Sequence, residues 1–172
     1  MKKELLLLRH AKSSWDNPKL DDFDRPLAPR GRDSAPLIAR VLEERHWRPR
    51  MALVSSSTRT RETWELLSSH FAHAPSPTFR DSLYEASAEQ LLAEVHHTPE
   101  IVSTLLVLGH NPGLEEFALR LAGNDSDQAA LKQLRKKFPT AGLARLEFTG
   151  RWAELQFGGA RLLDCLRPKD FA

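Results

Sequence analysis

The sequence predicts an α/β fold: a three-layer α/β/α sandwich on a mostly parallel central sheet. Apolar runs alternate with segments of helical periodicity, which is the pattern of successive βαβ units. Three of the apolar runs, at residues 5–8, 51–54 and 105–108, are followed within a few residues by arginine or histidine. Open parallel sheets hold their ligands at the carboxyl ends of the strands, so the sequence indicates a functional site at that edge.

Each element is assigned from its apolar spacing and from the turn residues on either side of it. The expected strands are at residues 4–9, 51–55, 78–80 and 104–109, and the expected helices at residues 34–45, 60–71, 88–97, 112–121 and 128–137. The last of these helices is basic and should lie at the surface or form a lid. Residues 142–148 and 151–157 alternate across Thr149 and Gly150, which predicts an antiparallel hairpin at a sheet edge.

Two of the helices have an expected starting point. Proline is tolerated only in the first turn of a helix, so Pro36 should lie there, with Asp33 or Ser34 as the N-cap. Ser87 directly precedes the helix expected at 88–97 and is a suitable N-cap for it.

A long polar loop, residues 12–29, separates the first strand from the first helix. A loop of this length in a compact domain is usually functional or disordered. Because it begins just after His10, we expect it to be functional. We also expect Asp24 and Arg25 to form an ion pair that holds the loop over the site.

Length and composition favour a single domain spanning residues 1–172, with 41% hydrophobic and 28% charged residues. The formal net charge is only +2, and the 25 Lys and Arg are spread among 23 acidic residues. This distribution lacks the basic stripe of a nucleic-acid footprint, so no nucleic-acid partner is expected.

The cysteine and histidine content gives no sign of a metal site or a disulfide. The only cysteine, Cys165, excludes an internal disulfide and should be an inert, partly buried thiol. His70, His73, His96 and His97 have no acidic or cysteine partners at recurring spacing, so they are interpreted as surface residues. We therefore expect no metal and no other cofactor.

The N-terminus, a few charged residues before four leucines, resembles the start of a signal peptide. The apolar stretch is nevertheless too short and has no cleavage site after it. No segment approaches the roughly 18 apolar residues of a membrane span. We therefore expect a cytoplasmic protein without a membrane partner, while the sequence leaves the oligomeric state open.

The side chains at the three strand ends are those of a phosphoryl-transfer site. Arg9 and His10 follow the first strand, Arg59 follows the second and His110 follows the third. Guanidinium groups bind phosphate oxygens bidentately, and they disfavour a charged imidazole nearby. A neutral imidazole can attack phosphorus and become a phosphohistidine, so His10 is the expected nucleophile. His110 is the expected hydrogen-bond donor to a phosphate oxygen.

These same segments resemble a known family. Residues 8–11 (LRHA) resemble the Arg-His-Gly signature of the histidine phosphatase superfamily, the phosphoglycerate-mutase-like proteins. Residues 54–63 are similar to the second motif of that superfamily, and residues 109–112 (GHNP) to its second catalytic histidine. Five segments together resemble the short SixA-type phosphohistidine phosphatases: residues 9–15, 24–27, 30–31, 83–87 and 109–113. The resemblance ends near residue 122, and the role of residues 123–172 is left open.

The resemblance implies a phosphoglycerate-mutase-like fold and a set of site residues. The implied catalytic residues are His10, Arg9, Arg59, His110 and, as the one candidate for an acidic proton donor, Glu85; Arg9, Arg59 and His110 are also the implied phosphate-binding residues. Ser14, in the loop after the nucleophile, is a further candidate phosphate-binding residue from its position alone. The chain departs from the family pattern at Ala11, where glycine is usual, and at residues 56–58, where a proline-containing turn is usual.

The residues and the resemblance together predict a metal-independent phosphatase that forms a phosphohistidine intermediate. The SixA-type motifs favour a protein substrate, a phosphohistidine carrier or phosphotransfer domain, because a short chain can do little to enclose the site. One alternative is a phosphomonoesterase that acts on a small metabolite or nucleotide, which a poised Glu85 in a closed pocket would favour. The other is a non-catalytic module that binds phosphate or phosphohistidine.

Overall fold

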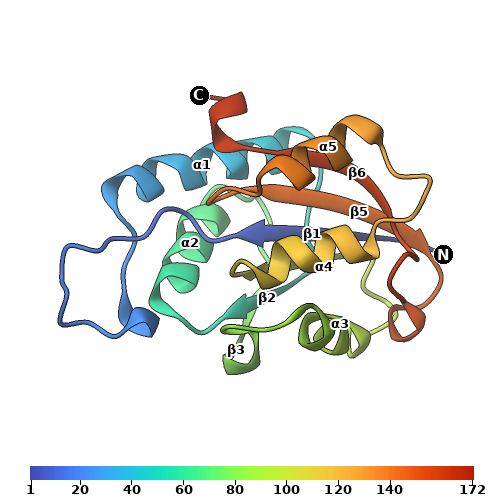
Figure 1. The fold of residues 1–172 in the computed structure, drawn as a ribbon, viewed down its shortest axis with the longest axis horizontal. Helices are drawn as coiled ribbons and strands as arrows, with labels where there is room; N and C mark the ends of the chain where they lie inside the picture. Colours follow the sequence, from blue (N-terminus) through green and yellow to red (C-terminus); the bar gives the residue numbers. More distant parts are fainter.

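A six-stranded sheet with the order β3-β2-β4-β1-β5-β6 runs through the computed structural model, which describes residues 1–172 (Figure 1). The strands are β1 (Lys2–Arg9), β2 (Met51–Ser55), β3 (Pro77–Arg80), β4 (Thr104–Gly109), β5 (Leu143–Thr149) and β6 (Arg161–Leu166). Strands β3, β2, β4 and β1 pair in parallel, whereas β5 is antiparallel to both β1 and β6. The expected mostly parallel sheet is therefore confirmed.

Helices cover both faces of the sheet and complete three layers (Figure 1). They are α1 (Pro29–Glu44), α2 (Thr58–Ser68), α3 (Ala88–His96), α4 (Gly113–Leu121) and α5 (Gln128–Lys136). Successive side chains of a strand point to opposite faces. In β1, Leu6 and Leu8 pack with α1 and α2, while Leu5 and Leu7 pack in the core that contains α3, α4 and α5. This two-sided burial explains the uninterrupted run of leucines.

The first helix begins earlier than the sequence analysis predicted. Helix α1 starts at Pro29, with Ala28 at the N-cap position, and Pro36 lies inside the helix rather than in its first turn. Proline suits the first helical position because the missing N–H has no intrahelical partner there. The helix continues through Pro36 despite the lost backbone hydrogen bond, because Ile38 and Leu42 on the same helix are fully buried against the sheet.

The C-terminal hairpin was predicted with the wrong second strand. The partner of β5 is β6, whereas residues 151–157 contain a 3-10 turn, Trp152–Glu154. Leu155 and Phe157 are two residues apart, which resembles strand alternation, but the buried pair Trp152 and Leu155 is three residues apart, as in a 3-10 turn. The pairing shifts register in β5 at Arg145 and Leu146, which breaks the period of two in β6 and hides this strand in the sequence.

Other expected features agree with the structure. Ser87 caps α3, and its hydroxyl accepts a hydrogen bond from the Gln90 backbone N–H. Cys165 is buried in β6, and burial raises the pKa of its thiol to about 12. None of the helices is both long enough and apolar enough to cross a bilayer.

Candidate active site

The ends of three parallel strands bring His10, His110 and Arg59 together. Arg9 and Gly109 are paired neighbours in β1 and β4, so the two histidines that follow them lie side by side, with ring centroids 5.3 Å apart. Arg59 lies in the first turn of α2, directly after β2. Its Nε is 3.4 Å from His10 Nε2, and its Nη2 is 3.4 Å from His110 Nδ1. All three side chains are buried.

One hydrogen bond determines which nitrogen of His10 is available. His10 Nδ1 lies 2.7 Å from the carbonyl oxygen of Ala11. A carbonyl only accepts, so Nδ1 carries the proton and donates it to Ala11. Nε2 is then left with a free lone pair, next to Arg59. Burial, together with the positive charge of nearby Arg59 and Arg9, lowers the pKa of His10 to about 3, so the ring is neutral at pH 7.

His110 is held by the turn that follows β2. Its Nε2 lies 2.8 Å from Ser55 Oγ and 3.5 Å from Ser57 Oγ. Because Arg59 can only donate, His110 Nδ1 accepts from it and Nε2 donates to Ser55 in this arrangement. Burial and the charge of Arg59 lower the pKa of His110 to about 4. Ser55 was not among the predicted site residues, although its position at the end of β2 is a usable signal.

Arg9, the last residue of β1, contacts the segment that leads into β5. Its Nη1 donates to the Phe138 carbonyl at 3.1 Å, while its Nε is buried without a hydrogen-bond partner. Burial lowers its pKa, and the nearby Glu115 carboxylate opposes this effect. Asn111 donates to the same carbonyl at 3.0 Å and accepts from the Glu115 backbone N–H. Asn111 therefore orders the segment that Arg9 contacts.

Asp22, which the sequence analysis did not select, contacts Arg59 directly. Arg59 donates to the Asp22 carbonyl at 2.6 Å and to Asp22 Oδ2 at 3.0 Å. Tyr84 also donates to Oδ2, and its ring packs edge-on against His110 at 5.3 Å. The hydrogen bond from Tyr84, then those from Arg25 and Arg59, hold the pKa of Asp22 well below its usual range. Burial and the Asp22 carboxylate raise the pKa of Tyr84 to about 12.

The expected ion pair in the long loop has a different acidic partner. Arg25 Nη1 lies 2.8 Å from Asp22 Oδ1, and Asp24 forms no ion pair. Residues Asp22–Asp24 form a 3-10 turn, which changes the direction of successive side chains and places Asp22 toward both arginines. The loop therefore does contact the cluster, because Asp22 of the loop binds Arg59 of the cluster.

Two of the predicted site residues, Glu85 and Ser14, lie outside these contacts. Glu85 is exposed, has a left-handed backbone with φ of 57°, and its side chain forms no hydrogen bond or ion pair. It follows Tyr84, so its backbone is adjacent to the cluster. Ser14 Oγ accepts from the Asp16 backbone N–H at 3.0 Å and stabilises a local turn. No group of three or more His, Cys, Asp or Glu side chains is arranged to hold a metal ion.

Comparison with known proteins is consistent with this geometry. The histidine phosphatase superfamily (branch 1) matches residues 5–104. An uncharacterized protein of Mycobacterium tuberculosis is 36% identical over 163 residues, which cover 94% of this chain and all of the relative. The solved structure of a Nakamurella multipartitia protein assigned as phosphohistidine phosphatase SixA is 31% identical, with a TM-score of 0.85 and coverage of 98% and 97% of the two chains. Its Agrobacterium tumefaciens counterpart is 32% identical, with a TM-score of 0.81 and coverage of 96% and 98%.

Proposed function

The chain belongs to branch 1 of the histidine phosphatase superfamily and is of the SixA type, and from this premise we propose that it removes phosphate from phosphohistidine in proteins. The reaction needs no metal and passes through a phosphohistidine formed on His10. The supporting observation is the orientation of His10, whose protonated Nδ1 faces the Ala11 carbonyl while Nε2 faces Arg59 and the second histidine.

In the first step, the lone pair of His10 Nε2 attacks the phosphorus atom of the substrate. The bond from phosphorus to the substrate imidazole breaks, its electron pair stays on the departing nitrogen, and the imidazole leaves neutral because its other ring nitrogen already carries a proton. The phosphoryl group is then bound to His10 Nε2. Arg59 and Arg9 stabilise the negative charge on the equatorial oxygens, and the partnerless Nε of Arg9 is a donor still available for that purpose. In the second step, water attacks phosphorus, releases inorganic phosphate and restores neutral His10.

The Asp22 carboxylate occupies the donors of Arg59, so a phosphoryl group that binds to Arg59 must take its place. Its carboxylate and carbonyl accept from both terminal nitrogens of the guanidinium. A phosphoryl group with its three oxygens accepts from the same donors and carries more charge, so it replaces Asp22 when substrate binds. Ser55 allows His110 to change its tautomer at the same time, because a hydroxyl can either accept a hydrogen bond from Nε2 or donate one to it. When Ser55 donates, His110 Nδ1 carries the proton and can donate to the phosphate.

The buried cluster contains no carboxyl group that could protonate a leaving group, which favours phosphohistidine over an alkyl ester. Asp22 contacts Arg59, but its hydrogen bonds from Tyr84, Arg25 and Arg59 hold its pKa well below the usual range, so it carries no proton to give. Glu85 is exposed. An alkoxide needs a proton in the transition state, whereas imidazole is a far better leaving group. A P–N bond can therefore be cleaved without a strong general acid.

A test compares wild type with His10→Gln on a phosphohistidine peptide and on p-nitrophenyl phosphate, both in the presence of EDTA. Wild type should turn over both, and acid-quenched enzyme should lose its bound phosphate while base-quenched enzyme keeps it. His10→Gln should lose at least about 10³-fold in kcat/KM, as expected for removal of a nucleophile.

The matched control is His70→Gln, which replaces an exposed histidine outside the cluster and should leave kcat/KM unchanged. Full turnover by His10→Gln would remove His10 as the nucleophile. Loss of wild-type activity in EDTA would contradict the metal-independent mechanism. Turnover of small alkyl phosphates far above that of phosphohistidine would instead identify a phosphomonoesterase.

A further inference from the structure

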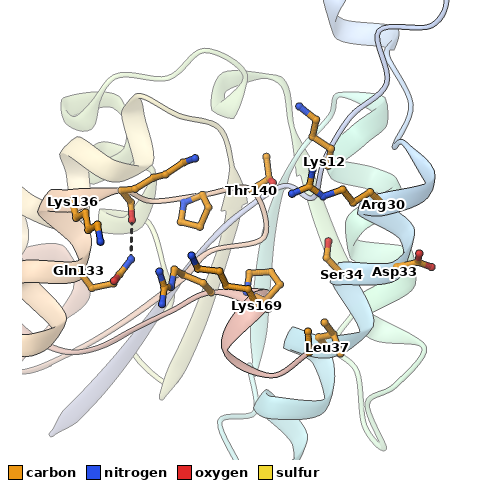
Figure 2. Close-up of a pocket in the computed structure, with 14 residues that line it drawn as sticks. Lys12, Arg30, Asp33, Ser34, Leu37, Gln133, Lys136, Thr140 and Lys169 are labelled. Carbon is orange, nitrogen blue, oxygen red and sulfur yellow. Dashed lines mark hydrogen bonds between the residues drawn. The ribbon is translucent and has the colours of Figure 1, made fainter.

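A strongly basic cavity of about 480 Å³ lies between α1, α5 and the C-terminal segment. We call it the basic basin and define it by six cations that line it: Lys12, Arg30, Lys136, Lys137, Arg167 and Lys169. Figure 2 shows Lys12 and Arg30 on one side, Lys136 on the other and Lys169 between them. Asp33 is the only acidic side chain in the lining, although the whole chain carries a net charge of just +2.

Most of these cations have no carboxylate partner within the protein. Arg167 pairs with Asp170 at 2.7 Å, whereas the other five form no ion pair. Many arginines elsewhere in the protein do form ion pairs: Arg145, for example, contacts both Glu4 and Asp164. The basin is therefore a local excess of positive charge, and its field attracts anions toward this part of the surface.

Helix stability explains only part of this charge. Lys136 lies in the last turn of α5, where a cation interacts favourably with the helix dipole. Arg30 lies in the first turn of α1, where the dipole disfavours a cation and where no acidic residue offsets it. Arg30 therefore opposes the local electrostatics of its own helix, which points to a role outside that helix.

The basin adjoins the active-site cluster along the same edge of the sheet. Leu8, near the end of β1, pairs with Leu143 at the start of β5, and Leu143 pairs with Leu166 at the end of β6. The segments that enter β5 and leave β6 therefore emerge beside His10. The Ala141 N–H donates to the His10 carbonyl at 2.9 Å. Two residues of the basin lining, Lys12 and Thr140, therefore lie close to the His10 backbone along the chain.

We propose that the basic basin is the docking surface for an acidic segment of the protein that carries the phosphohistidine. The proposal rests on the proposed function and names the class of partner. The cations that face solvent come from separate segments of the chain and carry long, flexible side chains. Such an arrangement suits several carboxylates along an extended chain, because each pair forms at the surface and speeds encounter.

The experiment uses two phosphohistidine peptides of about 12 residues, long enough to extend roughly 20 Å on either side of the phosphorylated residue. One has aspartate and glutamate in its flanks, and the other has serine and glutamine. Free phosphohistidine serves as the small substrate. Wild type should cleave the acidic peptide with a kcat/KM roughly tenfold or more above that of the neutral peptide, and high salt should remove this preference.

The variant Arg30→Glu/Lys136→Glu/Lys169→Glu should lose the preference for the acidic peptide while retaining wild-type kcat/KM on free phosphohistidine. The control is Arg40→Glu/Lys132→Glu/Arg50→Glu, which makes the same charge change at exposed positions outside the basin, two of them on the same helices. This control should keep the preference. A second basin variant, with glutamine at the three positions, covers the case in which charge reversal prevents folding.

Each remaining outcome decides the proposal. Equal cleavage of both peptides by wild type would overturn the docking surface while leaving the phosphatase activity established. An equal loss in the basin and control variants would assign the preference to net charge and overturn it too. If wild type hydrolyses p-nitrophenyl phosphate but neither peptide nor free phosphohistidine, the proposed function fails, and the docking proposal fails with it.

Discussion

Asp22 is the residue through which the long loop controls Arg59. Its carboxylate contacts Arg59, Arg25 and Tyr84. If phosphate must displace this carboxylate, Asp22→Asn should strengthen anion binding, because a neutral amide competes less well for a guanidinium. The Asp22 side chain is 45% exposed, so solvent screens the effect, and we expect the inhibition constant of inorganic phosphate or vanadate to fall by roughly three- to tenfold.

Asp24→Asn is the control, because this neighbouring carboxylate is exposed and forms no ion pair. It should leave the inhibition constant unchanged, as measured by competition against p-nitrophenyl phosphate. Weaker anion binding in Asp22→Asn would show the opposite role: that Asp22 holds Arg59 in the position that phosphate requires.

Glu85 provides a separate test of the leaving group. If it acts as a general acid, Glu85→Gln should slow alkyl phosphate hydrolysis by roughly the 10²–10⁴-fold typical of such a loss. Phosphohistidine cleavage should change by less than about twofold, because imidazole leaves without that help. Parallel kcat/KM measurements on the two substrates decide the matter. An equal loss on both would indicate that Glu85 positions the adjacent backbone.

At the scale of single residues, the sequence predicted those side chains whose position follows from a strand end. His10, Arg59 and His110 follow buried apolar runs, and parallel strands bring such positions together. Asp22 and Tyr84 lie in irregular segments without periodicity. Their contacts with the cluster depend on the path of two loops through space, which local sequence patterns do not encode.

The packing of α1 against the active-site loop depends on a single glycine. A Cβ on Gly31 would lie only 2.2 Å from the Lys12 carbonyl oxygen, which also accepts a hydrogen bond from the Ala28 N–H. Gly31→Ala must therefore push the helix and the loop apart. We expect it to destabilise the protein by roughly 1–3 kcal/mol, despite the better helix propensity of alanine. Urea denaturation measures this change, and kcat/KM should fall because Lys12 lies close to His10 in sequence.

Arg40→Ala is the control on the same helix, since Arg40 is exposed and forms no ion pair. It should change the free energy of unfolding by less than about 0.5 kcal/mol. A Gly31→Ala protein as stable as wild type would mean that α1 and the loop do not approach this closely in solution.

At the scale of elements, the errors in prediction have specific causes. Pro36 moved the predicted start of α1, because the general cost of an internal proline outweighed the cue from Pro29. The 3-10 turn Trp152–Glu154 was mistaken for a strand, and the register shift in β5 concealed β6. In each case long-range packing determined the local structure. The central parallel strands were predictable because burial on both faces leaves an unmistakable apolar run.

The stability of the whole molecule should decrease on mild acidification because two buried histidines resist protonation. Burial lowers the pKa of His10 to about 3 and that of His110 to about 4, whereas unfolded histidine titrates near 6.5. Between these values the unfolded chain binds more protons than the native protein, so the free energy of unfolding falls as pH falls. From about pH 7 to about pH 5, the loss should be up to roughly 2 kcal/mol per imidazole.

Urea denaturation at several pH values measures this slope. The double variant His10→Gln/His110→Gln should show a clearly flatter dependence over the same range, because glutamine does not titrate. His70→Gln should retain the wild-type slope, since that side chain is exposed. A slope unchanged in the double variant would mean that the two imidazoles titrate normally in the folded protein.

The basic basin forms only when the whole chain folds, because its residues are far apart in the sequence. Its cations lie near residues 12, 30, 136 and 168, so the sequence shows them as evenly spread charge. The spread of charge along the sequence therefore does not reveal that the folded surface concentrates positive charge at this place. The fold gathers these residues because the loop after β1, the start of α1, the end of α5 and the chain after β6 meet at one edge of the sheet.

The buried Cys165 allows the local opening of β6 to be followed by thiol labelling. Strand β6 lies at the end of the sheet, and its thiol is shielded with a pKa of about 12, so a disulfide reagent should react only after this strand detaches. With no second cysteine to compete, the labelling rate under native conditions reports the free energy of that local opening. The labelling rate of the Cys165 thiol therefore measures how often the outermost strand leaves the sheet.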